Sequence, residues 1–262
     1  MHILRAILFA HLISLLYVAT ICGQWLQTGP YGGDVRSFAL SGSNLFAGTH
    51  GDGVLLSTDN GSSWTQVNTG LADPNVFTLA VSDTNLFAGT RSGDVFLSTN
   101  NGGSWTSVSN GLSNLGVMTL AVSDTNLFAG TFGSGVYLST NNGSSWTPAS
   151  NGLTNVFIRA IAVSDSNLFA GTNGGGVFLS TNNGSSWTAV NTGLRNTFIR
   201  TLAVSGTNLF AGTFGDGVFL STNNGTSWTE VNNGLKNKNV NTLLVSGTNL
   251  FAGTFGGGVF LS

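Results

Sequence analysis

The stretch NLFAGTFGDGVFLSTNNGTSW, residues 208–228, decides the fold of this chain. It contains two short apolar segments, each bounded by glycine, asparagine or serine, and it ends in tryptophan. Its opening NLFAGT recurs every 41 residues, at Asn44, Asn85, Asn126, Asn167, Asn208 and Asn249. A period of about 40–45 residues with several short strands is typical of the blades of a β-propeller. We therefore predict an all-β, six-bladed β-propeller of four-stranded antiparallel blades.

Within one repeat, four strands are expected at residues 199–205, 208–213, 217–221 and 227–232, because each segment is rich in Val, Leu, Phe and Thr and is bounded by turn residues. The first three strands occur six times, but the fourth occurs only five times inside the repeats. Residues 24–27 resemble a sixth copy. The prediction is that this N-terminal strand completes the C-terminal blade and closes the ring, so that the propeller spans residues 24–262.

Residues 1–23 differ from the repeats, because Arg5 precedes an apolar run over residues 6–21. This pattern predicts a signal peptide that is cleaved after Cys22 or Gly23. A membrane anchor is the alternative, but the run is shorter than the roughly 20 residues of a spanning helix. The mature protein would then contain no cysteine and no membrane span. We expect a monomer that is secreted or periplasmic in a bacterium.

The turn before each tryptophan has a recurrent pattern, which in the first copy consists of Ser57, Asp59, Gly61 and Trp64. It resembles the Asp-box, S-x-D-x-G-x-x-W, of the bacterial neuraminidase repeat family. The other four copies, which end at Trp105, Trp146, Trp187 and Trp228, have Asn at the Asp position. The resemblance implies a propeller in which the box is a structural turn at the blade periphery. Ycf48-type propellers, which assist photosystem assembly, are similar in repeat architecture only.

The connections on one face of the predicted disc vary between repeats, whereas those on the other face are nearly uniform. Antiparallel strands place alternate connections on opposite faces, so the loops between the second and third strands lie beside the inter-blade links. Variable loops on a constant scaffold are where binding residues are usually found. The candidate binding residues of this face are Tyr31, His50, Arg91, Phe132, Phe214 and Phe255.

Arg36, Arg159 and Arg200 share one position in the repeat, the second residue of the innermost strand. We expect the three side chains to meet at the mouth of the central channel. Guanidinium groups match the geometry of carboxylates and phosphates, so this cluster predicts an anion-binding site. Neuraminidases also use an arginine triad, for the carboxylate of their substrate.

Catalysis is not the favoured interpretation. A neuraminidase also needs a tyrosine nucleophile, an assisting carboxylate and a separate acid/base, but Glu230 is predicted on an outer strand and Tyr137 in the core. No metal or cofactor motif is present. Charged residues make up only 7% of the chain and its net charge is −2, which disfavours nucleic-acid binding.

The function predicted from the sequence is therefore a non-catalytic binding or scaffold module. The expected partner is a protein, a peptide or an anionic glycan that binds the variable face. Two alternatives stay open at this point. One is a glycoside hydrolase of the exo-sialidase type or a lectin-like propeller, and the other is a purely structural protein of the cell envelope.

Overall fold

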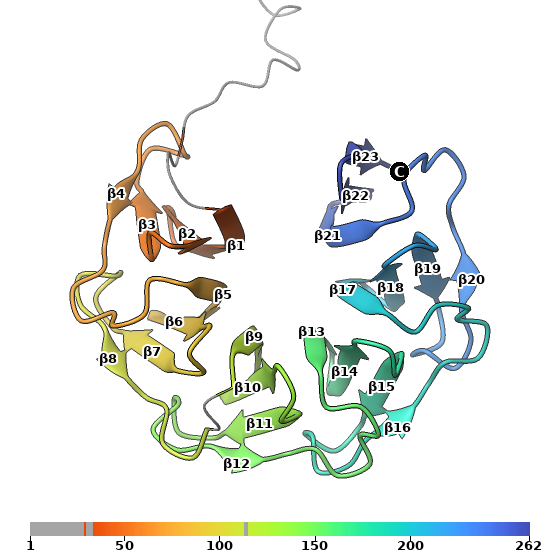
Figure 1. Cartoon of the computed structure of the whole chain (residues 1–262), viewed down its shortest axis with the longest axis horizontal. Coiled ribbons are helices and arrows are strands. Elements are labelled where there is room, and N and C mark those ends of the chain that lie inside the picture. The colour runs from red at the N-terminus through yellow and green to blue at the C-terminus, as the bar shows by residue number, and fades with distance from the viewer. Residues whose placement is uncertain (1–28, 30–33, 113–114) are drawn as a thin grey trace, which may run out of the picture.

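The computed structural model describes residue 29 and residues 34–112 and 115–262. Six antiparallel sheets follow one another around a ring, and we number them as blades one to six in chain order (Figure 1). The all-β, six-bladed propeller is therefore confirmed. None of the described residues is helical, so no helical membrane span occurs among them.

The innermost strand of each blade lines the centre of the ring (Figure 1). These strands are β1 (Asp34–Ser41), β5 (Val76–Ser82), β9 (Val117–Ser123), β13 (Ile158–Ser164), β17 (Ile199–Ser205) and β21 (Val240–Ser246). The second strands carry the NLFAGT segment, and they are β2 (Asn44–His50), β6 (Asn85–Thr90), β10 (Asn126–Thr131), β14 (Asn167–Thr172), β18 (Asn208–Thr213) and β22 (Asn249–Thr254).

The third strands are β3 (Val54–Ser57), β7 (Val95–Ser98), β11 (Val136–Ser139), β15 (Val177–Ser180), β19 (Val218–Ser221) and β23 (Gly258–Leu261). The fourth strands have only two residues each: β4 (Thr65–Gln66), β8 (Thr106–Ser107), β12 (Thr147–Pro148), β16 (Thr188–Ala189) and β20 (Thr229–Glu230). Blades one to five thus have four strands, and blade six has three among the described residues. The predicted closing strand at residues 24–27 lies outside the described residues.

The hydrophobic core consists of layers between neighbouring blades. Between blades one and two, for example, Phe46 and Val54 pack against Val76, Leu86 and Trp105. Equivalent residues fill the next three layers. Both faces of an internal blade are therefore apolar, which explains why NLFAGT does not alternate strictly between apolar and polar residues.

In the part of the chain that the structure describes, the ring is open between blade one and blade six, and β1 and β21 lie on the two sides of the opening (Figure 1). The blade faces that border it carry exposed apolar side chains, with Phe38 58% exposed and Leu244 62% exposed. The repeat-equivalent positions between other blades belong to the packed layers. These two faces are therefore chemically the same as the buried ones.

Candidate ligand-binding site at the channel mouth

A β-bulge places one residue of every innermost strand at the channel. In β13, Ile158 pairs with Thr172 and Ala160 pairs with Gly171, so Arg159 has no partner of its own in the ladder. The same register shift occurs in all six blades. A bulge redirects a side chain out of the regular alternation. The bulged residues are Arg36, Phe77, Met118, Arg159, Arg200 and Asn241.

A second set of residues lies in the loop that follows the second strand of each blade. The buried Thr172 holds this loop in blade four, because its Oγ1 donates to Gly176 O at 2.9 Å and accepts from Gly175 N at 3.0 Å. The first residue of this loop also forms an isolated β-bridge with a residue of the link that enters the next blade, as in the pairs Phe132–Phe157 and Phe214–Asn239. A constant scaffold thereby presents a variable set: His50, Arg91, Phe132, Asn173, Phe214 and Phe255.

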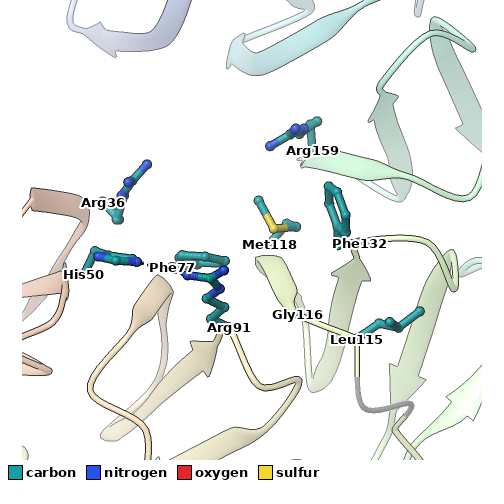
Figure 2. Close-up of a pocket in the computed structure, with 9 residues that line it drawn as sticks. All are labelled: Arg36, His50, Phe77, Arg91, Leu115, Gly116, Met118, Phe132 and Arg159. Carbon is teal, nitrogen blue, oxygen red and sulfur yellow. Dashed lines mark hydrogen bonds between the residues drawn. The ribbon is translucent and has the colours of Figure 1, made fainter.

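Both sets, apart from Asn173, line two cavities of about 590 and 840 Å³ that share Arg36, Met118 and Arg159. In the first cavity, Arg36 and Arg159 reach in from opposite sides, and Met118 lies between them (Figure 2). The second cavity adds Arg200 and Phe214. None of the described residues that line either cavity is an aspartate or a glutamate.

Two of the arginines lie against phenylalanine rings. The Arg159 guanidinium carbon lies 5.7 Å from the centroid of the Phe132 ring, and that of Arg200 lies 4.7 Å from the centroid of Phe214. Arg159 thus crosses from blade four to a loop of blade three. These cation–π contacts restrain both guanidinium groups without neutralising their charge.

The charge of this pair is not compensated among the described residues, where neither Arg159 nor Arg200 forms an ion pair. The Nε atom of Arg159 is buried and has no hydrogen-bond partner within the described ranges. Burial, followed by the positive charge of Arg200, lowers the pKa of Arg159 from its ordinary value. Two like charges held together in a partly buried site are stabilised when an anion binds between them.

On the far side of the first cavity, His50 stacks on Phe77, with ring centroids 6.4 Å apart and an angle of 13° between the planes. Arg91 Nη1 lies 3.5 Å from His50 Nε2, a long contact that suits the tautomer in which Nε2 accepts (Figure 2). The cavity therefore contains an aromatic and cationic cluster at each end.

Some basic residues of the variable face are neutralised at its rim. Lys238 Nζ donates to Glu230 Oε1 at 2.9 Å, and Arg195 lies 3.7 Å from the other oxygen of this carboxylate. A hydrogen bond from Asn232 and the contact with Lys238 lower the pKa of Glu230. Arg36 pairs with the exposed Asp34 at 3.2 Å. Among the described residues, Arg91, Arg159 and Arg200 line the cavities and form no ion pair.

The Asp-box-like turns form a separate, structural set at the start of the fourth strands. Ser57 Oγ donates to Asp59 Oδ1 and accepts from Gly61 N, both at 2.8 Å. Three bonds to Ser63 and Ser57 lower the pKa of Asp59 to about 2. Asn141 and Asn182 make equivalent bonds, so the Asp-to-Asn change preserves the turn.

The structure brings together eight of the nine residues predicted for binding, and Tyr31 lies outside the described residues. Sequence reasoning missed Met118, Asn239, Asn241 and Thr242, which also line the cavities. Met118 and Asn241 could have been found, because they occupy the same repeat position as Arg36. No three His, Cys, Asp or Glu side chains of the described ranges come together as metal ligands would.

Residues 112–251, more than half of the chain, match the DUF6242 beta propeller domain, so the chain belongs to this family. No curated protein matches the sequence.

Solved structures resemble it in fold. The extracellular domain of a putative one-component system from B. thetaiotaomicron has a TM-score of 0.75 at 20% identity over 90% of this chain. An ancestral GH74 enzyme has a TM-score of 0.73 at 22% identity over 92% of this chain. Ycf48 bound to D1 peptide has a TM-score of 0.67 at 18% identity, covering 83% of this chain and 74% of that one. This chain spans only 34% of the first structure and 38% of the second.

Proposed function

We propose that this protein is an extracytoplasmic binding module that holds an acidic peptide segment at the mouth of its central channel. The observation that carries the proposal is the Arg159–Arg200 pair, which is restrained by two phenylalanine rings and has no counter-charge among the described residues. A peptide carboxylate between the two guanidinium groups would accept bidentate, charge-assisted hydrogen bonds.

The apolar residues of the cavities suit a peptide that carries an aromatic or aliphatic side chain beside its acidic one. Phe77, Met118 and Leu115 line the first cavity, while Phe214 and Phe255 line the second. Cavities of several hundred Å³ with apolar walls and a few polar groups are typical ligand sites. Of the similar structures, the peptide complex of Ycf48 and the extracellular domain support a binding role, although they share only the fold.

The similarity to GH74 enzymes does not lead us to propose glycoside hydrolysis. That chemistry uses two carboxyl groups on either side of the scissile bond, and the described residues that line the two cavities provide no carboxyl group. The export of the protein rests on the predicted signal peptide at residues 1–23, and it is part of the proposal.

The alanine pair Arg159→Ala/Arg200→Ala should weaken the binding of a fluorescein-labelled peptide with alternating Glu and Phe by at least 10-fold. Each charge-assisted hydrogen bond contributes about 1.5–3 kcal/mol, and about 1.4 kcal/mol corresponds to a tenfold change in affinity. Fluorescence anisotropy at 50 and 300 mM salt measures the effect, and the wild-type affinity should fall at the higher salt concentration.

Arg195→Ala is the matched control, because it removes an arginine of the same face that contacts Glu230 at the rim. Its affinity should stay within twofold of wild type, and the melting temperatures of all variants should stay close together. Equal affinities of the double variant and wild type would refute the proposed site. Binding of a sulfated oligosaccharide but no acidic peptide would show a glycan-binding module instead.

A further inference from the structure

Arg91 lines the first cavity at the end opposite Arg159, and the proposed function does not use it (Figure 2). It lies in the loop after β6, which departs from the repeat. In the loops of blades one, three, four and five, the second residue is a glycine with a φ of 109–114°, and its N–H donates to a backbone oxygen of the following link. In blade two this residue is Ser92, whose N–H donates to Asp73 Oδ2 at 2.9 Å. The loop that presents Arg91 is therefore held by a side chain instead.

The guanidinium group of Arg91 has no ion-pair partner among the described residues. Asp73 and Asp94 border a depression beside it. Both of these carboxylates bond to Ser92, because Asp94 Oδ2 accepts from Ser92 Oγ at 3.0 Å. The guanidinium group instead contacts Nε2 of His50, which lines the first cavity (Figure 2). The positive charge of Arg91 is thus available to a ligand in this cavity.

The link that enters blade three joins the two ends of the cavity. Gly116 lines the cavity with its backbone alone, at the position where the other links carry Asn75, Phe157, Phe198 or Asn239. A Cβ atom added to Gly116 would lie 2.9 Å from Arg91 O, so glycine lets this link lie close against the Arg91 loop. Gly116 O also accepts from Phe132 N at 2.9 Å. One short segment thereby positions both the loop of Arg91 and the loop of Phe132, against which Arg159 lies.

The wall between the two cationic ends is apolar. Leu115, Met118 and Phe77 line it, and Met118 lies between the arginines of the two sides (Figure 2). Alternate side chains of an extended peptide point to the same face, and the first and fifth residues lie about 13 Å apart. A segment with acidic, apolar and acidic side chains at alternate positions therefore matches the order of the groups along the cavity.

We propose that Arg91 binds a second carboxylate of the same ligand, which is a segment with acidic, apolar and acidic side chains at alternate positions. One carboxylate lies between Arg159 and Arg200, and the apolar side chain contacts Met118. The other carboxylate accepts charge-assisted hydrogen bonds from the Arg91 guanidinium group. This inference rests on the function proposed above, and it adds the number and the order of the groups that the site recognises.

The test compares two fluorescein-labelled peptides with blocked termini, whose cores are Glu-Ser-Phe-Ser-Glu and Glu-Ser-Phe-Ser-Gln. They differ by one carboxylate. Fluorescence anisotropy at about 50 mM salt limits the screening of the charges. Wild type should bind the peptide with two Glu residues roughly 5-fold more tightly, because Arg91 is exposed and a single exposed ion pair has a modest effect. Arg91→Ala should reduce this affinity ratio to less than about twofold, and Arg91→Glu should invert it.

Lys236→Ala is the matched control, because it removes an exposed positive charge of the same face that lines neither cavity. It should keep the affinity ratio of wild type. The double variant Arg159→Ala/Arg200→Ala separates the two proposals, since it should weaken the binding of both peptides. If it does so while both Arg91 variants keep the wild-type ratio, the second carboxylate site is overturned and the proposed function stands. If the double variant binds both peptides as wild type does, the proposed function fails and this inference fails with it.

Discussion

Trp187→Ala should reduce the free energy of unfolding by about 3–5 kcal/mol, the usual cost of removing a buried aromatic side chain from a close-packed core. Trp187 is 4% exposed and lies in the layer between blades three and four, with Phe128, Ile158 and Leu168. Its Nε1 donates to Ala149 O at 2.8 Å. The substitution leaves both a cavity and an unpaired backbone oxygen.

Urea denaturation of wild type and variant measures this loss. Trp64→Ala is the matched control, because Trp64 is only half-buried and bonds to its own turn at Gly61 O. Its loss should be less than half that of Trp187→Ala. Equal losses for the two variants would contradict the view that the inter-blade layers hold the fold together.

Gly152→Ala should be destabilising by about 2–4 kcal/mol, the sum of left-handed backbone strain and overpacking. Gly152 has a φ of 88°, and a Cβ atom at this position would lie 2.3 Å from Trp187 O. The backbone of the link and that of the next blade would have to move apart. This separation would also break the hydrogen bond from Trp187 N to Asn151 O.

The variant Gly206→Asp serves as a control that distinguishes destabilisation by backbone strain from destabilisation by close contact. Gly206 has a φ of 57° and no neighbour within 4 Å of an added Cβ atom. Asp83, Asp124 and Asp165 occupy the same turn position with φ of 51–53°. The free energy of unfolding of this control, measured by chemical denaturation, should differ from that of wild type by less than about 1 kcal/mol, the scale of a turn substitution at a compatible site. A loss as large as that of Gly152→Ala would show that φ alone accounts for both effects.

The sequence predicted the first and second strands of the repeat with their observed bounds, because turns of Asn, Gly and Ser mark them. The fourth strand was expected at residues 227–232, but β20 covers only Thr229–Glu230. Trp228 N bonds to the preceding link at Thr192 O, and Asn232 bonds by its side chain to Val218 N. A contact with the preceding link and a side-chain bond within the blade thus take the residues that a longer ladder would need, and no local propensity reports such contacts.

The channel-mouth residues could be predicted from their shared repeat positions, but their arrangement could not. The bulge that turns Arg159 toward the channel belongs to the pairing of β13 with β14. The contact of Arg159 with Phe132 joins two blades, and the neutralisation of Lys238 and Arg195 by Glu230 joins the outer strand to the links. Each depends on tertiary geometry, which a repeat alignment does not contain.

Hydrogen–deuterium exchange with and without a saturating acidic peptide tests the proposed binding face most directly. We expect slower exchange at the start of β13 and β17 and in the loops that carry Phe132 and Phe214. The turns from Ser57 to Trp64 and their repeats on the other face should show no change. Protection confined to those turns, or absent from the first residues of β13 and β17, would contradict the proposed binding face.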